Sequence, residues 1–226
     1  MQYELKGKVA HFAFDDGKAN AIGHTLIDAL NDALDKAETD GAGAFLMSGR
    51  PGIFSAGFDL KEFAKGPESG IAMVEKGMEL LIRLYSLPMP LVVGCTGHGI
   101  AMGAFIILAC DSRLGTRGDF RITLPETASN MEIPGVMFEL TKARLSPRYL
   151  TRAAIQAEVF SPDEAVTAGF FEEVVEADEL EARALAVAEQ LAELPGEYYT
   201  RNKLALRADV LGQMRQALEE AQAAAG

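Results

Sequence analysis

The sequence predicts an α/β fold in which short buried strands alternate with helices through the first half, while helices dominate the second half. One observation behind this prediction is a series of short apolar runs before about residue 116, separated by segments with helical periodicity. Another is a group of later segments that open with Ser-Pro or Asp-rich signals, which are typical of helix N-termini. A chain of 226 residues with 49% hydrophobic content can bury the core of one compact domain.

The first half supplies most of the predicted strands. Alternating or continuous apolar residues predict strands at 8–16, 43–49 and 90–97. Apolar residues at helical spacing predict helices at 25–38 and 70–88. The order of strand, strand and helix repeats about twice without a fixed sequence period, which is compatible with a spiral of such turns.

The centre and the second half are predicted to be mostly helical. Residues 103–111 are apolar all round, which fits a helix in the middle of the molecule, and a strand is expected at 112–116. Further helices are expected at 146–156, 161–169 and 177–194, each behind an N-terminal signal.

The final segment, residues 198–225, is amphipathic, and no low-complexity linker separates it from the rest of the chain. It should therefore pack on this subunit or on a neighbouring one. The stripe expected to face the protein consists of Leu204, Leu211, Met214 and Leu218.

Composition restricts the functional class. A formal net charge of -12 argues against nucleic acid as a partner. Cys95 and Cys110 are too few for a disulfide framework or a metal site, which favours a reducing, cytoplasmic setting. The charged N-terminus lacks the apolar run of a signal peptide, and no apolar run of roughly 18 residues occurs, so we expect a soluble protein without membrane association.

Two glycine-containing segments could carry chemistry. They are "FSAGFDL" (54–60) and "GHGIAMGAFIILACD" (97–111), each at the start of a predicted helix. Amide groups at a helix start lack intrahelical partners, so two such loops facing each other would form a two-donor oxyanion site. Small residues such as Ala56, Gly57 and Ala101 would let a ligand carbonyl reach those amides. Alternatively, the glycines serve only tight turns and close helix packing.

A third segment, residues 120–135, contains a candidate general base. Glu126 follows Pro125 among apolar neighbours, where loss of solvent should raise the pKa of its carboxyl group. That shift suits a general base. The alternative is a surface glutamate in a loop. Glu132, the nearest second carboxylate, is six positions away, so a shared helical face is not indicated.

Together these segments resemble one family, the crotonase or enoyl-CoA hydratase/isomerase superfamily. The resemblance runs from about Val9 to about Lys203 in the family's order and rests on five motifs: "KANAIGHTLIDAL", "FSAGFDLKEF", "GHGIAMGAFIILACDSRL", "ITLPETASNMEIP" and "SPDEAVTAGFFEEVV". It implies a crotonase-like spiral of repeated ββα turns over residues 1–190. It also implies a C-terminal helical trimerisation region over residues 191–226, within a homotrimer or a hexamer built as a dimer of trimers.

The resemblance also implies roles for individual residues. The backbone amides of Phe58 and Met102 would hold the thioester oxygen of an acyl-CoA substrate, and Glu126 would be the catalytic carboxylate. Coenzyme A is then part of the substrate, and neither a separate cofactor nor a metal is expected. Residues in segments that resemble the family's CoA-contacting parts are Lys18, Ala19, Ala56, Asp59, Leu60, Lys61 and Lys203.

One departure from the family pattern favours a particular reaction. Hydratases of the family use a second glutamate on the central helix, where this chain has Phe105, and phenylalanine cannot activate water. The spacing from Glu126 to Pro134 is similar to that of mitochondrial-type 3,2-enoyl-CoA isomerases. The resemblance therefore favours an isomerase that moves a 3,4 double bond to the 2,3 position. The alternatives are an enoyl-CoA hydratase and a non-catalytic acyl-CoA binding protein.

Overall fold

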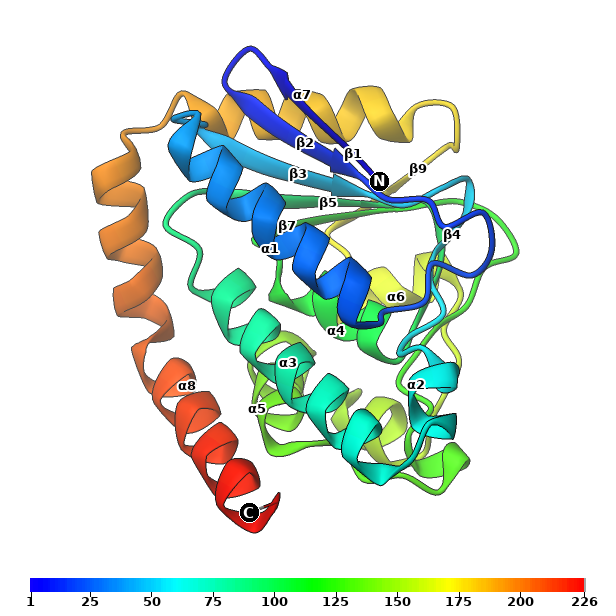
Figure 1. Cartoon of the computed structure of the whole chain (residues 1–226). Helices are drawn as coiled ribbons and strands as arrows, with labels where there is room; N and C mark the ends of the chain where they lie inside the picture. The colour runs from blue at the N-terminus through cyan, green and yellow to red at the C-terminus, as the bar shows by residue number, and fades with distance from the viewer. Residues whose placement is uncertain (226) are drawn as a thin grey trace.

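The protein, described over residues 1–225 by a computed structural model, has an α/β fold with two sheets (Figure 1). Neighbouring strands pair in parallel except for β1 and β2, which are antiparallel. In spatial order, the larger sheet contains β1 (Gln2–Lys6), β2 (Val9–Ala13), β3 (Ala44–Ser48), β5 (Leu91–Cys95), β7 (Ser112–Thr116) and β9 (Glu173–Val175). The smaller sheet contains β4 (Gly52–Ser55), β6 (Gly97–Ile100) and β8 (Ile122–Thr123).

Helices cover both faces of the larger sheet, with α7 on one side and α1, α3 and α4 on the other (Figure 1). The helices are α1 (His24–Thr39), α2 (Leu60–Ala64), α3 (Pro67–Tyr85), α4 (Met102–Ala109), α5 (Gly135–Arg144), α6 (Pro162–Ala168), α7 (Leu180–Ala192) and α8 (Gly196–Ala225). Two single turns, a 3₁₀ turn at Thr127–Ser129 and a π turn at Thr151–Ile155, complete the elements. Among residues 1–225, no helix combines the length and apolar character needed to cross a bilayer.

The predicted spiral of strand, strand and helix is confirmed. Each turn places its first strand in the larger sheet and its second in the smaller one, followed by a helix: β3, β4 and α2–α3; then β5, β6 and α4; then β7, β8 and α5. All residues of α4 are buried, because this apolar helix is enclosed on every side, as its sequence predicts.

The helix predicted at 146–156 is wrong as a full helix. Only the π turn Thr151–Ile155 forms, and its buried residues are Ala153 and Ala154. The segment then bends at Ala157, whose φ is +50. The Ser-Pro start signal was therefore present without an apolar stripe long enough to support several helical turns.

The inward stripe of α8 matches the predicted one except at its start, and Leu218 is partly buried against the core as expected. Leu211 and Met214 are buried, as expected, but Leu204 is 37% exposed. Toward the start of the helix, the buried positions are taken instead by Arg207 and Lys203, spaced four residues apart. Basic residues occupy these positions because an acidic partner lies opposite them.

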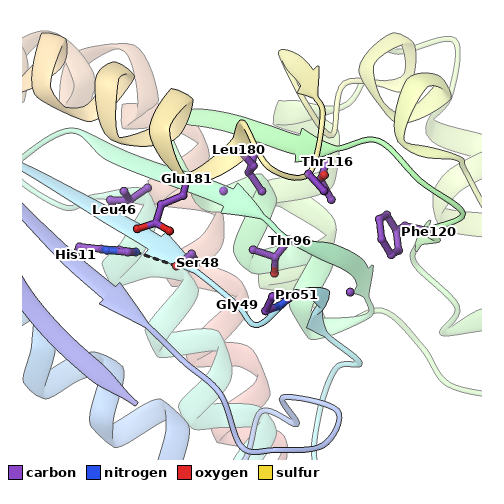
Figure 2. Close-up of a pocket in the computed structure, with 13 residues that line it drawn as sticks. His11, Leu46, Ser48, Gly49, Pro51, Thr96, Thr116, Phe120, Leu180 and Glu181 are labelled. Atoms are coloured by element: carbon purple, nitrogen blue, oxygen red, sulfur yellow. Dashed lines mark hydrogen bonds between the residues drawn. The ribbon is translucent and has the colours of Figure 1, made fainter.

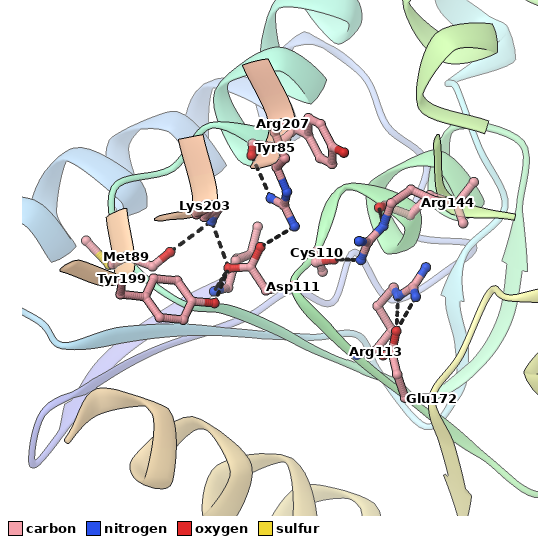
Figure 3. Close-up of polar contacts among 12 residues, drawn as sticks. Tyr85, Met89, Cys110, Asp111, Arg113, Arg144, Glu172, Tyr199, Lys203 and Arg207 are labelled. Carbon is pink, nitrogen blue, oxygen red and sulfur yellow. Dashed lines mark hydrogen bonds and ion pairs between the residues drawn. The ribbon is translucent and has the colours of Figure 1, made fainter. Parts of the chain in front are cut away.

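That partner is Asp111, which lies between the end of α4 and the start of β7 (Figure 3). One of its carboxylate oxygens accepts hydrogen bonds from Lys203 Nζ at 2.7 Å, Tyr199 OH at 3.0 Å and the Leu91 amide at 2.9 Å. Arg207 Nη2 lies 2.7 Å from the other oxygen, as an ion pair whose angles fall outside hydrogen-bond geometry. Burial lowers the pKa of Lys203, and the neighbouring Asp111 opposes that shift. This cluster fixes the start of α8 to the core.

The boundary predicted between residues 190 and 191 falls in the last turn of α7, and α8 begins after a short connection. Beyond the Asp111 cluster, α8 packs on α3 and α5 of the same chain. Its role in trimer formation stays a prediction, as does the predicted extension of this region to residue 226, which lies outside the described residues.

We expect Asp111→Asn to lower the free energy of unfolding by about 3 to 5 kcal/mol, because it leaves two buried cations without their counter-charge. Urea unfolding followed by circular dichroism measures this loss. The matched control is Glu197→Gln, which breaks an exposed ion pair with Arg201 on the same helix and should cost less than about 1 kcal/mol. Equal losses in the two variants would contradict the assigned importance of the cluster.

Candidate active site

The three residues predicted to be catalytic follow the three strands of the smaller sheet. Phe58 comes after β4, Met102 begins α4 directly after β6, and Glu126 comes after β8. These strands are parallel neighbours, with Ser55 opposite Gly99 and Ile100 opposite Thr123. Because the carboxyl ends of parallel strands meet at one edge, the sheet carries all three residues at the same edge.

The two loops predicted to supply oxyanion donors are in contact. A Cβ atom added to Gly57 would lie 2.8 Å from the Ala101 Cβ and 3.5 Å from the Met102 amide nitrogen. Within residues 1–225, the amides of Phe58 and Met102 donate no hydrogen bond, and Met102 is the first residue of its helix. Two neighbouring loops therefore each present a free N–H group.

Ala101 sets the direction of the second amide. It has φ 50 and ψ -123, a conformation that residues other than glycine rarely adopt. The Ala101 amide donates to Thr123 O at 3.1 Å, and the Ala101 carbonyl accepts from the Phe105 amide at 3.1 Å. These bonds hold the strained backbone, so the peptide that carries the Met102 amide is fixed before any ligand binds.

Asn20, which sequence reasoning did not single out, joins the N-terminal loop to the first oxyanion loop. Its buried side-chain NH₂ group donates to Phe14 O and Phe54 O, each at 3.1 Å. The backbone carbonyl of Asn20 accepts from Ser55 Oγ at 2.8 Å. Its φ of 50 is left-handed, a region that asparagine enters more readily than most residues. An asparagine between small residues in "KANAIG" was the available signal.

The residues predicted to contact CoA gather around these loops. The Ala56 amide donates to Ala19 O at 3.0 Å, so the two segments lie side by side. Asp59 caps α2 by accepting from the Lys61 amide at 3.0 Å. Lys18, Leu60 and Lys61 are exposed, and in the described part of the chain neither lysine enters an ion pair. Both ammonium groups are thus available to an anionic ligand.

Lys203 does not fit the CoA contact that the resemblance implies. Its side chain is 5% exposed, and its ammonium donates to Asp111 and to Met89 O. It therefore serves the internal ion cluster, which leaves it unable to reach a phosphate in this conformation.

Glu126 is buried, with 6% of its surface exposed, so the interpretation as a solvated loop glutamate is wrong. Burial raises the pKa of its carboxyl group to about 7, and its Oε2 atom has no hydrogen-bond partner within residues 1–225. The Ser129 and Met131 amides both donate to the Glu126 carbonyl at 2.9 Å and shape the turn that presents it. Glu132, by contrast, is exposed.

An apolar surface leads away from the loops of Phe58 and Met102 along α3. The Phe58 ring and the Met102 side chain lie against Gly77, where an added Cβ would be 2.7 Å and 3.3 Å from their atoms. The Phe58 ring also meets Phe63 edge to face, with centroids 6.4 Å apart. Phe63 borders a pocket of about 430 Å³ between α3 and the end of α8, which is also lined by Pro67, Gly70, Ile71, Val74, Glu75, Met78, Pro134, Ala221 and Gln222.

Two further residues, Phe105 on α4 and His98 on β6, belong to the elements on either side of the Ala101 turn. Phe105 is fully buried within α4, so no carboxylate stands at this position of the central helix. His98 accepts a hydrogen bond from the Arg121 amide at Nδ1, at 3.0 Å, and stacks edge to face on Phe120. It has a structural role in the loop.

The spiral of ββα turns and the paired glycine-containing loops define a crotonase-type fold. A family model described as Enoyl-CoA hydratase/isomerase matches residues 4–224. The chain therefore belongs to the enoyl-CoA hydratase/isomerase family, which confirms the resemblance found in its motifs.

Similarity to individual proteins does not divide hydratases from isomerases. The chain is 32% identical over 148 residues to a probable enoyl-CoA hydratase of Bacillus subtilis, a match covering 64% of this chain and 55% of that relative. It is 29% identical to human mitochondrial enoyl-CoA delta isomerase 1, and this match covers 88% of this chain and 67% of the human protein. An apo enoyl-CoA isomerase structure from Mycobacterium tuberculosis is 36% identical, covers 98% of this chain and 97% of that one, and superposes with a TM-score of 0.94.

We expect Gly57→Ala to destabilise the protein by about 1 to 3 kcal/mol. Gly57 has φ 96, and the new methyl group would collide with the Ala101 Cβ. The double variant Gly57→Ala/Ala101→Gly removes the collision but not the unfavourable φ of residue 57. In a double-mutant cycle, the double variant should therefore lose less unfolding free energy than the sum of the losses in the two single variants. Simple additivity would contradict the contact between the loops.

Proposed function

We propose that the protein is an enoyl-CoA isomerase that converts a 3-enoyl-CoA into the conjugated 2-enoyl-CoA, with Glu126 as its one proton-carrying carboxylate. The observation that carries this proposal is the burial of Glu126 beyond the smaller sheet, with its pKa raised to about 7. The apolar Phe105 in the adjacent central helix supports it, because that position offers no second carboxylate for activating water.

In the proposed mechanism, the thioester oxygen accepts hydrogen bonds from the Phe58 and Met102 amides. The Glu126 carboxylate removes a proton from C2, and the electron pair of that C–H bond moves into the enolate, whose oxygen the amides stabilise. The protonated Glu126 then returns the proton to C4 as the double bond forms between C2 and C3. The proton is conserved, and no water or redox partner is consumed.

Both parts of this site lower the same barrier. In other enzymes, removing one oxyanion donor costs on the order of 3 kcal/mol of transition-state stabilisation. A base with a pKa near 7 is about half ionised at neutral pH and is more basic than a solvated carboxylate, which favours removal of a weakly acidic C–H proton. The strained backbone at Ala101 prepares the second donor in advance.

We place the acyl chain along the apolar surface that begins at Phe58 and continues to the pocket between α3 and α8. The CoA portion would then extend toward Ala19, Ala56 and Asp59, with Lys18 and Lys61 available to its phosphates. A trimer or hexamer remains part of the proposal. It is supported by Tyr198 and Leu206 at the start of α8, which are exposed by 64% and 86%.

The second candidate function is hydration of a 2-enoyl-CoA. It is favoured by the similarity to the Bacillus subtilis protein named a probable enoyl-CoA hydratase. Crotonyl-CoA, which has no 3,4 double bond to move, separates the two reactions. Hydration of crotonyl-CoA faster than isomerisation of 3-hexenoyl-CoA would replace the first proposal. Binding of both esters without turnover would favour a non-catalytic acyl-CoA binding protein.

Glu126→Gln should lower kcat for isomerisation of 3-hexenoyl-CoA by about 100-fold to 10,000-fold, because the amide cannot accept the C2 proton. Formation of the conjugated product is followed by its ultraviolet absorbance. The affinity for a saturated acyl-CoA, measured by calorimetry, should stay within about threefold, since the amides of Phe58 and Met102 are retained. Glu132→Gln is the matched control and should retain wild-type kcat. Full activity of Glu126→Gln would remove this residue from the mechanism.

The pH dependence of kcat/KM should report Glu126. The rate should rise with pH and level off above about 7, where the carboxylate is ionised. Stability should change in the opposite direction. Because the folded pKa lies above the ordinary value of 4.5, the contribution of protonated Glu126 is complete below 4.5 and is lost as pH rises through about 7. The free energy of unfolding of Glu126→Gln should therefore increase relative to that of the wild type as the pH rises from about 4.5 to about 7. Parallel plots of unfolding free energy against pH for the two proteins would contradict the raised pKa.

A further inference from the structure

A pocket of about 210 Å³ lies on the α7 side of the larger sheet, away from the candidate active site (Figure 2). Leu180 and Glu181, at the start of α7, form one of its walls, and Phe120 and Pro51 form another. The remaining residues that line it are His11, Leu46, Ser48, Gly49, Gly52, Gly94, Thr96, Thr116 and Ala177. None of the residues assigned to the proposed reaction is among them.

The strand pattern explains why this pocket is polar at its base. Beneath α7 the sheet face is apolar, and just beyond the start of the helix the same face becomes polar. Leu114 belongs to the apolar cluster that the sheet forms with α7. Thr116, two positions later on β7, points to the same face. The same change occurs from Val9 to His11, from Leu46 to Ser48 and from Val92 to Thr96.

Two hydroxyl groups at this base are left without partners. Thr116 is 3% exposed, and among residues 1–225 neither its Oγ1 atom nor that of Thr96 has a hydrogen-bond partner. Both residues line the pocket (Figure 2). Thr116 is the last residue of β7, and Thr96 directly follows Cys95 of β5, which pairs with Gly115 of β7. A buried hydroxyl without a partner is costly, so two together indicate a site built to bind a polar group.

The neighbouring pair His11 and Ser48 adds both a donor and an acceptor. His11 Nε2 lies 2.8 Å from Ser48 Oγ. Burial lowers the pKa of His11, so the imidazole is neutral at pH 7 and carries one N–H group and one acceptor nitrogen. Glu181 contributes a carboxylate that already accepts a hydrogen bond from Lys6 at 3.3 Å.

We propose that this pocket binds a small uncharged polyol, of monosaccharide size or smaller. Its three hydroxyls and neutral imidazole each donate and accept, which matches ligand hydroxyl groups, since these also do both. An anionic ligand is disfavoured because no lysine or arginine lines the pocket and one carboxylate does. The apolar walls of Leu46, Leu180 and Phe120 suit the C–H faces of such a molecule. This inference goes beyond the proposed function and does not depend on it.

The test is ligand binding to the full chain, measured by saturation-transfer NMR with D-ribose and myo-inositol as probes. We expect at least one probe to bind with a Kd of about 10 mM or tighter, as suits a ligand of this size. Thr116→Val should weaken binding by about fivefold to tenfold, because it keeps the side-chain shape and removes the hydroxyl. Ribose 5-phosphate should bind more weakly than ribose because of its charge.

Thr116→Val also has a readout that does not need a ligand. Since the hydroxyl of Thr116 has no partner in the described chain, its replacement should leave the thermal midpoint unchanged or raise it. The matched control Thr141→Val removes a buried hydroxyl that bonds Met137 O outside the pocket, so it should lower the midpoint and leave probe binding unchanged. Lack of binding by both probes, undiminished binding in Thr116→Val, or tighter binding of ribose 5-phosphate would each overturn the proposal.

Discussion

The close parallel pairing of β4 and β6 is the constraint on which the candidate site depends. At their amino ends the two backbones come so near that a Cβ atom added to Gly97 would lie 2.1 Å from the Gly52 carbonyl carbon. Only glycine permits this approach. The two strands stay paired up to the loops that contain Phe58 and Met102. The distance between the backbone amides of these two residues is therefore set by strand pairing that begins several residues earlier in the sequence. The proposed oxyanion site thus depends on the pairing of the sheet.

Some features of the site were predictable because their signals are local. The glycines around Phe58 and the Pro-Glu step at Glu126 lie in short motifs, and the structure places both at one edge of the smaller sheet. Features that depend on tertiary partners were not predictable in this way. The burial of Lys203 needs Asp111, 92 positions away in sequence, and the exposure of Leu204 at the start of the α8 stripe follows from the same pairing.

The proposed site is costly to the folded protein. A buried carboxyl group whose Oε2 has no partner among residues 1–225 and an alanine at positive φ both oppose folding. The surrounding structure offsets these costs with α4, every residue of which is buried, and with the hydrogen bonds around Asn20. The features that destabilise the fold are the same ones that the proposed reaction uses. A solvated carboxylate would be a weaker base, and a relaxed loop would hold its amide donor less firmly.

The length of α8 links two distant parts of the molecule. A helix of 30 residues extends about 45 Å, from the Asp111 cluster at one end to Ala221 and Gln222 on the wall of the apolar pocket at the other. Gln222 donates a hydrogen bond to Glu75 on α3 there. Because one helix carries both features, loosening its anchored end should shift the wall of the cavity. Substitutions in the Asp111 cluster should then alter which acyl chain lengths the proposed site accepts.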